Sequence, residues 1–531
     1  HELNQPGCYR DVKDTTVVAQ FKVIRDEKSD FLFKDTNLDV FILAWTTTPW
    51  TLPSNTALAV GKDILYRQVR TFNPYSGTPV ELILAADLMG NFFPEKNASL
   101  KMEDYQPGNK NIPFEVVKEF NGSRLEGIRY EQLIPWVNPG ENAFVVIPGD
   151  FVTTEEGTGI VHIAPTFGAD DFKVARQYNI SPLLVKDRSG NTMPLVDKKG
   201  RFIPLEEMDA DFVKKYVNVE LYREFAGRYV KNEYDDSLPP DAPVLDVDLA
   251  VMLKKENKAF KIEKYEHSYP HCWRTDKPVL YYPLDAWFIR TTALRDRMIE
   301  LNNTINWKPQ STGSGRFGKW LENLVDWNLS RSRFWGTPLP VWTSEDRKEQ
   351  ICISSVAELK KEIEKSVRAG FMRSNPLEKF REGDFSAENY SSFDLHRPFV
   401  DEIILVSPSG KKMFREEDLI DVWFDSGAMP YAQIHYPFEH TDDFAKYFPA
   451  DFIAEGVDQT RGWFYTLHAI STMISGSVSF RNIVSNGLVL DKNGNKMSKR
   501  LGNAVDPFET IEKYGADPLR WYMITNAQPW D

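Results

Sequence analysis

The sequence predicts an α/β protein with a β-rich first part and a second part that contains a parallel sheet. Its 531 residues are too many for one core, because domains usually hold about 100–200 residues. Up to residue 233, many short apolar runs are separated by Gly, Pro, Asn and Asp, which is typical of a β-barrel-like domain. From residue 266, helical patterns alternate with apolar runs, and residues 450–456 predict a buried strand ending in Glu455, the arrangement of an open parallel sheet.

Composition narrows the class of protein. Hydrophobic residues make up 42% of the chain and charged residues 27%, as in ordinary soluble globular proteins. The net charge of −13 argues against general, charge-driven binding of nucleic acid, although local basic loops could still hold a large folded RNA. No apolar run reaches the ~18–20 residues of a membrane helix and no signal peptide is present, so we expect a cytoplasmic protein with no membrane partner.

The cysteines predict neither disulfides nor a metal site. Cys8, Cys272 and Cys352 are too few for a disulfide framework, and no two lie at zinc-knuckle spacing. The stretch 267–274, HSYPHCWR, has two histidines and one cysteine, but no further ligand follows at the required spacing. We therefore expect a reducing compartment and no zinc.

The first part is predicted strand by strand. Residues 16–24 alternate apolar and polar side chains, which predicts a half-buried strand. Further strands are expected at 40–44, 80–85, 144–147 and 160–164, and helices at 171–178 and 209–225. Residues 1–14 are expected to be a connection, and the acidic, proline-rich stretch from 234 to 265 a linker or insertion.

Two polar stretches interrupt this β-rich part. In residues 45–55, WTTTPWTLPSN, Pro49 and Pro53 should prevent a regular strand or helix and leave four threonine hydroxyls available; an exposed turn is the alternative. Residues 157–172, GTGIVHIAPTFGADDF, carry His162 on a strand and reach Asp170 and Asp171 at a predicted helix start. A carboxylate there could simply cap the helix.

The second part contains helices, one insertion and a basic loop. Helices are expected at 286–305, 316–327 and 459–475, the last burying Phe464, Leu467, Ile470 and Ile474. Residues 344–396 are charged and weakly patterned, with one helix at 356–367, and suggest a solvated peripheral insertion. Glu455 could be a helix cap or a ligand-binding carboxylate.

The basic loop, residues 486–503, has a β-like run at 487–490 and a turn at 491–494. Lys496, Lys499 and Arg500 then surround Ser498 before a helix begins near Pro507 and continues to residue 525. Such a loop could hold a polyphosphate, or it could be a solvated basic turn.

The pentapeptide KMSKR at 496–500 resembles the KMSK[SR] signature of class I aminoacyl-tRNA synthetases. The stretches TTTPWTLPSN and GTGIVHIAPTFGADDF resemble the editing domain of the isoleucine-specific group, while SRSRFWGTPLPVW, LIDVWFDS and EGVDQTRGWF resemble its catalytic part. No His-x-Gly-His tetrapeptide occurs, and by resemblance it would lie upstream of His1. The implied fold is the second half of a Rossmann-like parallel sheet with an inserted β-barrel-like editing domain.

The resemblance also implies functional residues. The editing residues would surround the terminal adenosine and ester of tRNA, with His162 at the ribose and Asp171 at the ammonium group of a misattached amino acid; they are Thr46, Thr47, Thr48, Trp50, Asn55, His162 and Asp171. Trp423 and Trp463 would lie near the amino-acid side chain. The residues for ATP and the aminoacyl-adenylate would be Glu455, Gly456, Asp458, Gln459 and Lys499, and those for catalysis with Mg²⁺ would be Lys496, Ser498 and Lys499.

The implied organisation is an editing domain at 15–233, a catalytic domain at 266–505 and the start of a helical, tRNA-stem-contacting module at 506–531. The expected partners are isoleucine, ATP and tRNA(Ile), and the expected state is a monomer competent in editing but not in full activation. Two other functions stay open. The chain could be a free-standing hydrolase of mischarged tRNA, or a non-catalytic tRNA-binding relative.

Overall fold

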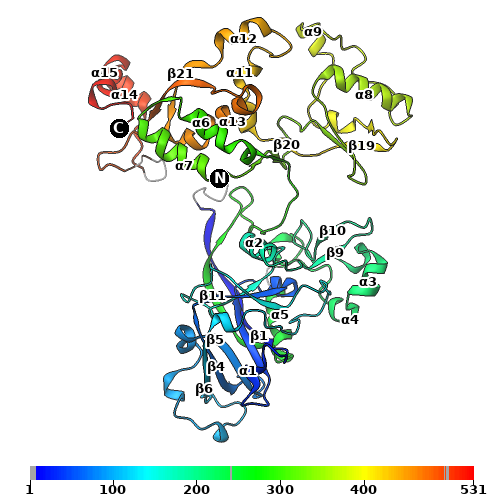
Figure 1. The fold of residues 1–531 in the computed structure, drawn as a ribbon, viewed down its shortest axis with the longest axis vertical. Coiled ribbons are helices and arrows are strands. Elements are labelled where there is room, and N and C mark those ends of the chain that lie inside the picture. Colours follow the sequence, from blue (N-terminus) through cyan, green and yellow to red (C-terminus); the bar gives the residue numbers. More distant parts are fainter. Residues whose placement is uncertain (1–6, 240–241, 496, 498–501, 531) are drawn as a thin grey trace. The chain divides into compact units, whose positions relative to one another are not determined.

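In the computed structural model, the chain forms two compact units, His1–Leu284 and Asp285–Asp531 (Figure 1). The structure describes residues 7–239, 242–495, 497 and 502–530. Within these ranges, none of the helices has both the length and the apolar character needed to cross a membrane. The division at residue 284 falls later than the predicted start of the second part at residue 266.

The first unit contains two main sheets. The larger has the order β11-β1-β2-β5-β4-β6, and the smaller the order β7-β3-β8. The strands are β1 (Tyr9–Lys22), β2 (Val40–Thr46), β3 (Ala57–Val60), β4 (Leu65–Phe72), β5 (Pro79–Ala85), β6 (Glu115–Asn121), β7 (Val145–Pro148), β8 (Ile160–Ile163) and β11 (Ala259–Pro270), with a small hairpin of β9 (Leu184–Lys186) and β10 (Thr192–Pro194). The predicted strands therefore exist. Among the described strands the pairing ends at β11 and β6, so closure into a barrel stays a prediction.

Strand β1 is buried on both faces over much of its length, so the prediction of a half-buried strand is wrong. Val17 belongs to one hydrophobic core and Val18 to another, because both faces of the sheet are covered. Gln20, one of the polar residues of the alternating pattern at 16–24, is 1% exposed. Its side chain donates to the carbonyl of Asn257 at 2.9 Å and accepts from the amide of Asn73 at 2.9 Å, which satisfies it inside the protein.

The predicted connection and linker belong to regular elements. The outer half of β1, starting at Tyr9, pairs antiparallel with the end of β11. Helix α5 (Leu245–Lys255) buries Leu245, Leu249 and Leu253 in the main core. The prediction of a linker over 234–265 is therefore wrong for its second half, because the apolar face of α5 packs on β1 and β11.

The remaining helices of the first unit are short. They are α1 (Asp30–Phe33), α2 (Ala169–Gln177), α3 (Ala210–Tyr216) and α4 (Val219–Tyr222). The helix predicted at 209–225 is split in two because the side chain of Asn218 accepts from the N–H of Leu221 and starts a new helix, as Asp209 does for α3.

The second unit contains a parallel sheet of order β13-β22-β21, formed by β13 (Asn306–Lys308), β22 (Phe480–Asn486) and β21 (Ala450–Gly456). Its helices include α6 (Arg295–Asn302), α7 (Gly318–Glu322), α10 (Val422–Gly427), α11 (Met429–Ala432), α12 (Thr441–Tyr447) and α13 (Trp463–Ser475). The parallel α/β prediction is confirmed. The prediction that β21 is buried is wrong, because β21 pairs only with β22 in the described part of the chain and Phe452 is 59% exposed.

Several helix predictions need correction. The pattern at 286–305 gives a short strand β12 (Phe288–Ile289) before a 3₁₀ turn and α6, and the pattern at 316–327 continues past α7 into β14 (Trp327–Asn328). Ile474, predicted to be buried, is exposed. Residues 487–490 are not a strand, since β22 ends at Asn486. The C-terminal helix is divided into α14 (Pro507–Tyr514) and α15 (Ala516–Asn526) by Gly515, whose φ is +90°.

The predicted solvated insertion at 344–396 belongs to a folded subdomain. A sheet of order β17-β16-β19-β18 packs with α8 (Val356–Arg368) around its own core, which includes Trp342, Ile363 and Leu405. The strands are β16 (Val341–Ser344), β17 (Gln350–Cys352), β18 (Leu405–Val406) and β19 (Lys412–Arg415); α9 (Ala387–Tyr390) follows α8, and β15 (Ser330–Arg331) pairs with β20 (Leu419–Ile420). Its apolar residues are spread among charged ones, so their pattern in the sequence did not predict a core.

Candidate functional site

The threonine-rich stretch forms a buried turn between β2 and β3. Its centre is a 3₁₀ helix, η2 (Pro49–Ser54), so the prediction that the prolines exclude any helix is wrong. Pro49 suits the first helical position, where no N–H is needed. Thr46, Trp50 and Thr51 are all buried, which rules out the alternative of an exposed turn.

Threonine hydroxyls in this turn form a chain of contacts that ends at His162. The hydroxyl oxygen of Thr48 lies 3.3 Å from that of Thr46 and 3.4 Å from that of Thr51. The hydroxyl of Thr51 also donates to the carbonyl of Thr48 at 2.8 Å and lies 3.2 Å from Nε2 of His162. Thr47 is half-buried and stands outside this chain.

Thr51 belongs to this hydroxyl chain, although it was not among the predicted editing residues. It lies three residues after Thr48, and side chains at that spacing eclipse each other in a 3₁₀ helix. The spacing of Thr48 and Thr51 can be read from the sequence, but it places their side chains together only if the turn is a 3₁₀ helix, which was not predicted.

His162 is brought to the turn by strand pairing. β8 runs antiparallel to β3, which follows η2 directly, and His162 lies opposite Leu58. Its surroundings lower the pKa of the ring from 6.5 to about 4 by desolvation, although part of the residue stays accessible. The imidazole is therefore neutral at pH 7. Its Nδ1 is buried and has no hydrogen-bond partner in the described part of the chain, so only Nε2 is engaged there.

Asp171 lies in the first turn of α2, and its carboxylate does not cap that helix at the N-cap position. Instead Oδ2 accepts from the N–H of Ala164 at 2.8 Å, two residues beyond His162. Burial raises the pKa of Asp171 to about 6, with a smaller contribution from the exposed Asp170. A Cβ at Gly168 would lie 2.8 Å from Cγ of Asp171, so a glycine is needed for the carboxylate to take this position.

Asn55 and Trp50 hold the turn in place. Asn55 is 2% exposed; its amide donates to the carbonyl of Ala57 at 2.8 Å, and its oxygen accepts from the hydroxyl of Tyr130 at 2.7 Å. The indole of Trp50 packs edge-on against Phe167 with ring centroids 5.0 Å apart. The structure does not bring Asn55 together with the hydroxyl chain, because its polar atoms are used within the core.

Four of the predicted adenylate residues, Glu455, Gly456, Asp458 and Gln459, lie at the end of β21 and in the turn that follows it. The side-chain oxygen of Gln459 accepts from the N–H of Trp463 at 3.0 Å, and its amide donates to Asp458 at 3.0 Å. Gln459 therefore caps α13, and the capping alternative for the exposed Glu455 has no support. A Cβ at Gly456 would lie 2.6 Å from Oδ1 of Asp458, so a larger residue there would displace this carboxylate.

Of the two predicted pocket tryptophans, Trp463 is the first residue of α13 and Trp423 lies on α10 close to the same end of that helix. Nε1 of Trp463 donates to the carbonyl of Ser426 at 2.9 Å. A Cβ at Gly462 would lie 3.1 Å from Cη2 of Trp423. The glycine thus permits Trp423 to approach the first turn of the helix that carries Trp463.

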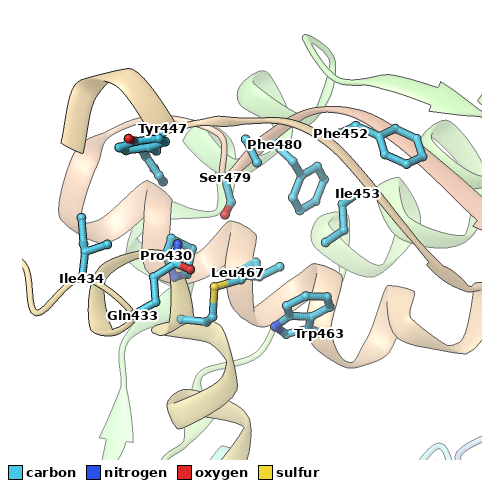
Figure 2. A pocket seen from close by; sticks show the side chains of 13 residues that line it. Pro430, Gln433, Ile434, Tyr447, Phe452, Ile453, Trp463, Leu467, Ser479 and Phe480 are labelled. Atoms are coloured by element: carbon cyan, nitrogen blue, oxygen red, sulfur yellow. The ribbon is translucent and has the colours of Figure 1, made fainter. Parts of the chain in front are cut away.

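An apolar pocket of about 160 Å³ lies along the same helix (Figure 2). Of the predicted residues, only Trp463 lines it. Half of the others come from residues 429–448, and the strand residues, such as Phe452 and Phe480, belong to the early parts of β21 and β22. Open α/β sheets bind ligands at the carboxyl ends of their strands, so this pocket is a poor candidate for the amino-acid site.

The predicted catalytic residues Lys496, Ser498 and Lys499 lie outside the described residues. The loop that leads to them is anchored by Asp491. Its Oδ1 accepts from the N–H groups of Asn493 and Asn495, each at 2.9 Å, and its Oδ2 accepts from the side chain of Asn503 at 2.9 Å. One carboxylate therefore binds both ends of the segment.

The histidines near Cys272 already have partners. Nδ1 of His271 lies 2.9 Å from the carbonyl of Tyr269, and Nε2 of His267 lies 3.1 Å from Asp14. In the described ranges, no group of three or more His, Cys, Asp or Glu side chains is arranged to hold a metal ion.

Comparison with known proteins gives one family. The family model for class I tRNA synthetases specific for isoleucine, leucine, methionine and valine matches residues 9–530. Over its whole length, the chain is 65% identical to an isoleucine–tRNA ligase of Bacteroides fragilis, 64% to one of Porphyromonas gingivalis and 42% to one of Clostridium acetobutylicum. It covers 46%, 47% and 42% of these relatives, respectively, so it spans less than half of their length.

Proposed function

Because the chain belongs to the class I tRNA synthetases, we propose that it contains the editing part and one half of the catalytic part of an isoleucine–tRNA ligase. The whole enzyme would use ATP, with its Mg²⁺, to activate isoleucine and transfer it to tRNA(Ile). The first unit would hold the editing domain at 15–233. The second would hold most of the catalytic domain at 266–505, since residues 266–284 belong to the first unit, and the beginning of the stem-contacting module at 506–531.

The observation that carries the proposal is the chain of hydroxyls from Thr46 to His162, with Asp171 bonded to the same strand end. Hydrolysis of a misattached amino acid requires a water molecule held near the ester and an anion near the ammonium group. Thr48 and Thr51 would orient the water, and the Asp171 carboxylate would hold the ammonium. His162, neutral at pH 7, would contact the ribose.

The need for editing follows from the size of the substrates. Isoleucine and valine differ by one methylene, which an apolar pocket distinguishes by only about 1–3 kcal/mol; the isoleucine enzyme is itself the standard example of this limit. The substrate of the site would therefore be valine attached to tRNA(Ile). Isoleucine on the same tRNA should be spared.

For activation, attack of the isoleucine carboxylate on the α-phosphate of ATP needs charge stabilisation more than acid–base groups. Lys496 and Lys499 would supply positive charge, with Ser498 between them. Glu455, Gly456 and Asp458 would meet the adenylate at the carboxyl end of β21. Gln459 would act mainly by capping α13, and Trp423 and Trp463 would lie near the amino-acid side chain.

The test uses tRNA(Ile) charged beforehand with valine or isoleucine. We expect residues 1–531 to deacylate the valyl form and leave the isoleucyl form largely intact. Equal rates for both forms would contradict selective editing. Binding of tRNA without deacylation would favour the non-catalytic tRNA-binding relative. We also expect a monomer, which sedimentation can check.

A further inference from the structure

A long-range hydrogen bond holds the threonine-rich turn from outside. Asp246 lies in the first turn of α5 and is 1% exposed. Its Oδ1 accepts from the N–H of Trp50 at 3.0 Å, across 196 residues of sequence. Helix α5 packs on η2 as well as on β1. The carboxylate thus joins a helix outside the predicted editing domain to the centre of the candidate site.

The 3₁₀ helix needs an acceptor at this position. The first N–H groups of a helix have no partner within it. Pro49 has no N–H, and the N–H of Thr51 bonds to the carbonyl of Thr48 at 3.0 Å. The N–H of Trp50 has no acceptor within the turn, and the carboxylate of Asp246 accepts its hydrogen bond.

This arrangement changes the role of Thr48. Thr48 occupies the N-cap position of η2, where a threonine hydroxyl usually accepts from the second or third N–H of the helix. Here the Thr48 side chain makes no capping bond, and its hydroxyl lies against those of Thr46 and Thr51 instead. Because Asp246 supplies the cap, Thr48 can take part in the chain that leads to His162.

We propose that Asp246 is a positioning residue for the threonine hydroxyls of the site, acting as a substitute N-cap for η2. It touches neither the substrate nor the reacting atoms. The proposal rests on the editing function proposed above. Its structural part, the capping of η2, can be tested separately.

Charged groups around Asp246 suggest how to test it. Nζ of Lys231 lies 3.9 Å from Oδ2 of Asp246 and 3.0 Å from Asp14, which in turn lies 3.1 Å from Nε2 of His267. Burial raises the pKa of Asp246 to about 7 despite Lys231. The N–H of Trp50 needs only an acceptor oxygen, and the side-chain amide of an asparagine supplies one without the charge.

The decisive comparison is Asp246→Asn against Asp246→Leu. Both remove the same charge beside Lys231, but only the asparagine keeps an acceptor for Trp50. We expect Asp246→Asn to deacylate valyl-tRNA(Ile) within about threefold of the wild-type kcat. Asp246→Leu should lose about tenfold or more in kcat with little change in KM. Asp248→Asn is the matched control on the same helix, since the carboxylate of Asp248 bonds to Arg228 at 2.6 Å and makes no bond to η2 among the described residues, and its rate should be unchanged.

Hydrogen exchange of the Trp50 amide provides a readout that needs no substrate. It should be faster in Asp246→Leu and close to wild type in Asp246→Asn; Asp246→Ala replaces the leucine variant if that one does not fold. Equal kcat and equal exchange in the two variants would overturn the proposal, as would an equal loss in Asp248→Asn. If the wild type itself does not deacylate while exchange follows the expected order, the editing function fails and the cap stands.

Discussion

Asp171 offers the sharpest separation between a catalytic and a structural role. Its carboxylate has two properties that different substitutions remove separately: a negative charge and an acceptor for the N–H of Ala164. Asp171→Asn removes the charge and keeps an acceptor oxygen. Asp171→Ala removes both and leaves a buried N–H at Ala164 without its partner. Asp170→Asn, at the exposed neighbour, is the control.

The expected effect on the rate follows from the charge. At pH 7 a carboxyl with a pKa of about 6 is mostly ionised, so the anion is available to the substrate ammonium. Hydrogen bonds to charged groups contribute about 1.5–3 kcal/mol, which corresponds to about a 10- to 150-fold slower deacylation of valyl-tRNA(Ile) in either variant. Asp170→Asn should stay close to the wild-type rate.

Asp171→Asn should lower the deacylation rate but should not lower the free energy of unfolding. The folded-state pKa is raised from 3.8 to about 6, so the protonated form stabilises the fold and this contribution is lost as the pH rises through about 6. The shift corresponds to about 3 kcal/mol, and partial access of water to the carboxylate reduces it to about 1–2 kcal/mol. Asp171→Asn should therefore be at least as stable as wild type at pH 7. Asp171→Ala should be less stable than Asp171→Asn.

The assay combines deacylation of pre-charged tRNA with thermal unfolding of each variant. Asp171→Asn should have a lower deacylation rate than wild type and an unchanged or higher melting temperature. If Asp171→Asn kept the wild-type rate per folded molecule, or if the rates and melting temperatures fell together in all three variants, the carboxylate would be structural. The assignment of Asp171 to the ammonium group would then be wrong.

Four further outcomes are expected. In the wild type, kcat/KM for deacylation should fall as the pH drops below about 6, and this fall should be absent in Asp171→Asn; a profile flat down to pH 5 would contradict the role of the anion. Asn55→Ala should lower the melting temperature and leave the rate per folded molecule nearly unchanged, since its polar atoms are bonded in the core; a large loss of rate without destabilisation would restore it to the substrate site. Residues 1–531 should show negligible isoleucine-dependent ATP–pyrophosphate exchange. A full-length relative should show this exchange and should lose it on the substitution equivalent to Lys499→Ala. Robust exchange by residues 1–531 would refute the prediction. Elemental analysis should find no zinc, and about one zinc per chain would place Cys272 in a site.

The sequence predicted what depends on local pattern and could not predict what depends on distant contacts. Strand β21 and helix α13 follow from short apolar runs and their periodicity, whereas β22 was not predicted. The burial of Gln20 could not be predicted, because its partners Asn73 and Asn257 come from remote parts of the chain. The same holds for the site: threonines 46 and 48 stood out by composition, whereas the cap from Asp246 has no local signal.

A buried titratable group indicates a functional site only when its accessibility and its hydrogen-bond partners are also considered. His468, in the second unit, also has a pKa lowered to about 4 by burial, yet it is completely inaccessible and Nε2 contacts the carbonyl of Met298 at 2.9 Å. A lowered pKa alone therefore does not identify a site. His162 differs because it stays partly accessible and its Nε2 meets a hydroxyl that other hydroxyls support. A titratable group with a shifted pKa is a better candidate for a functional residue when a ligand can reach it. His162 meets this condition and His468 does not, so His162 is the better candidate for the active site.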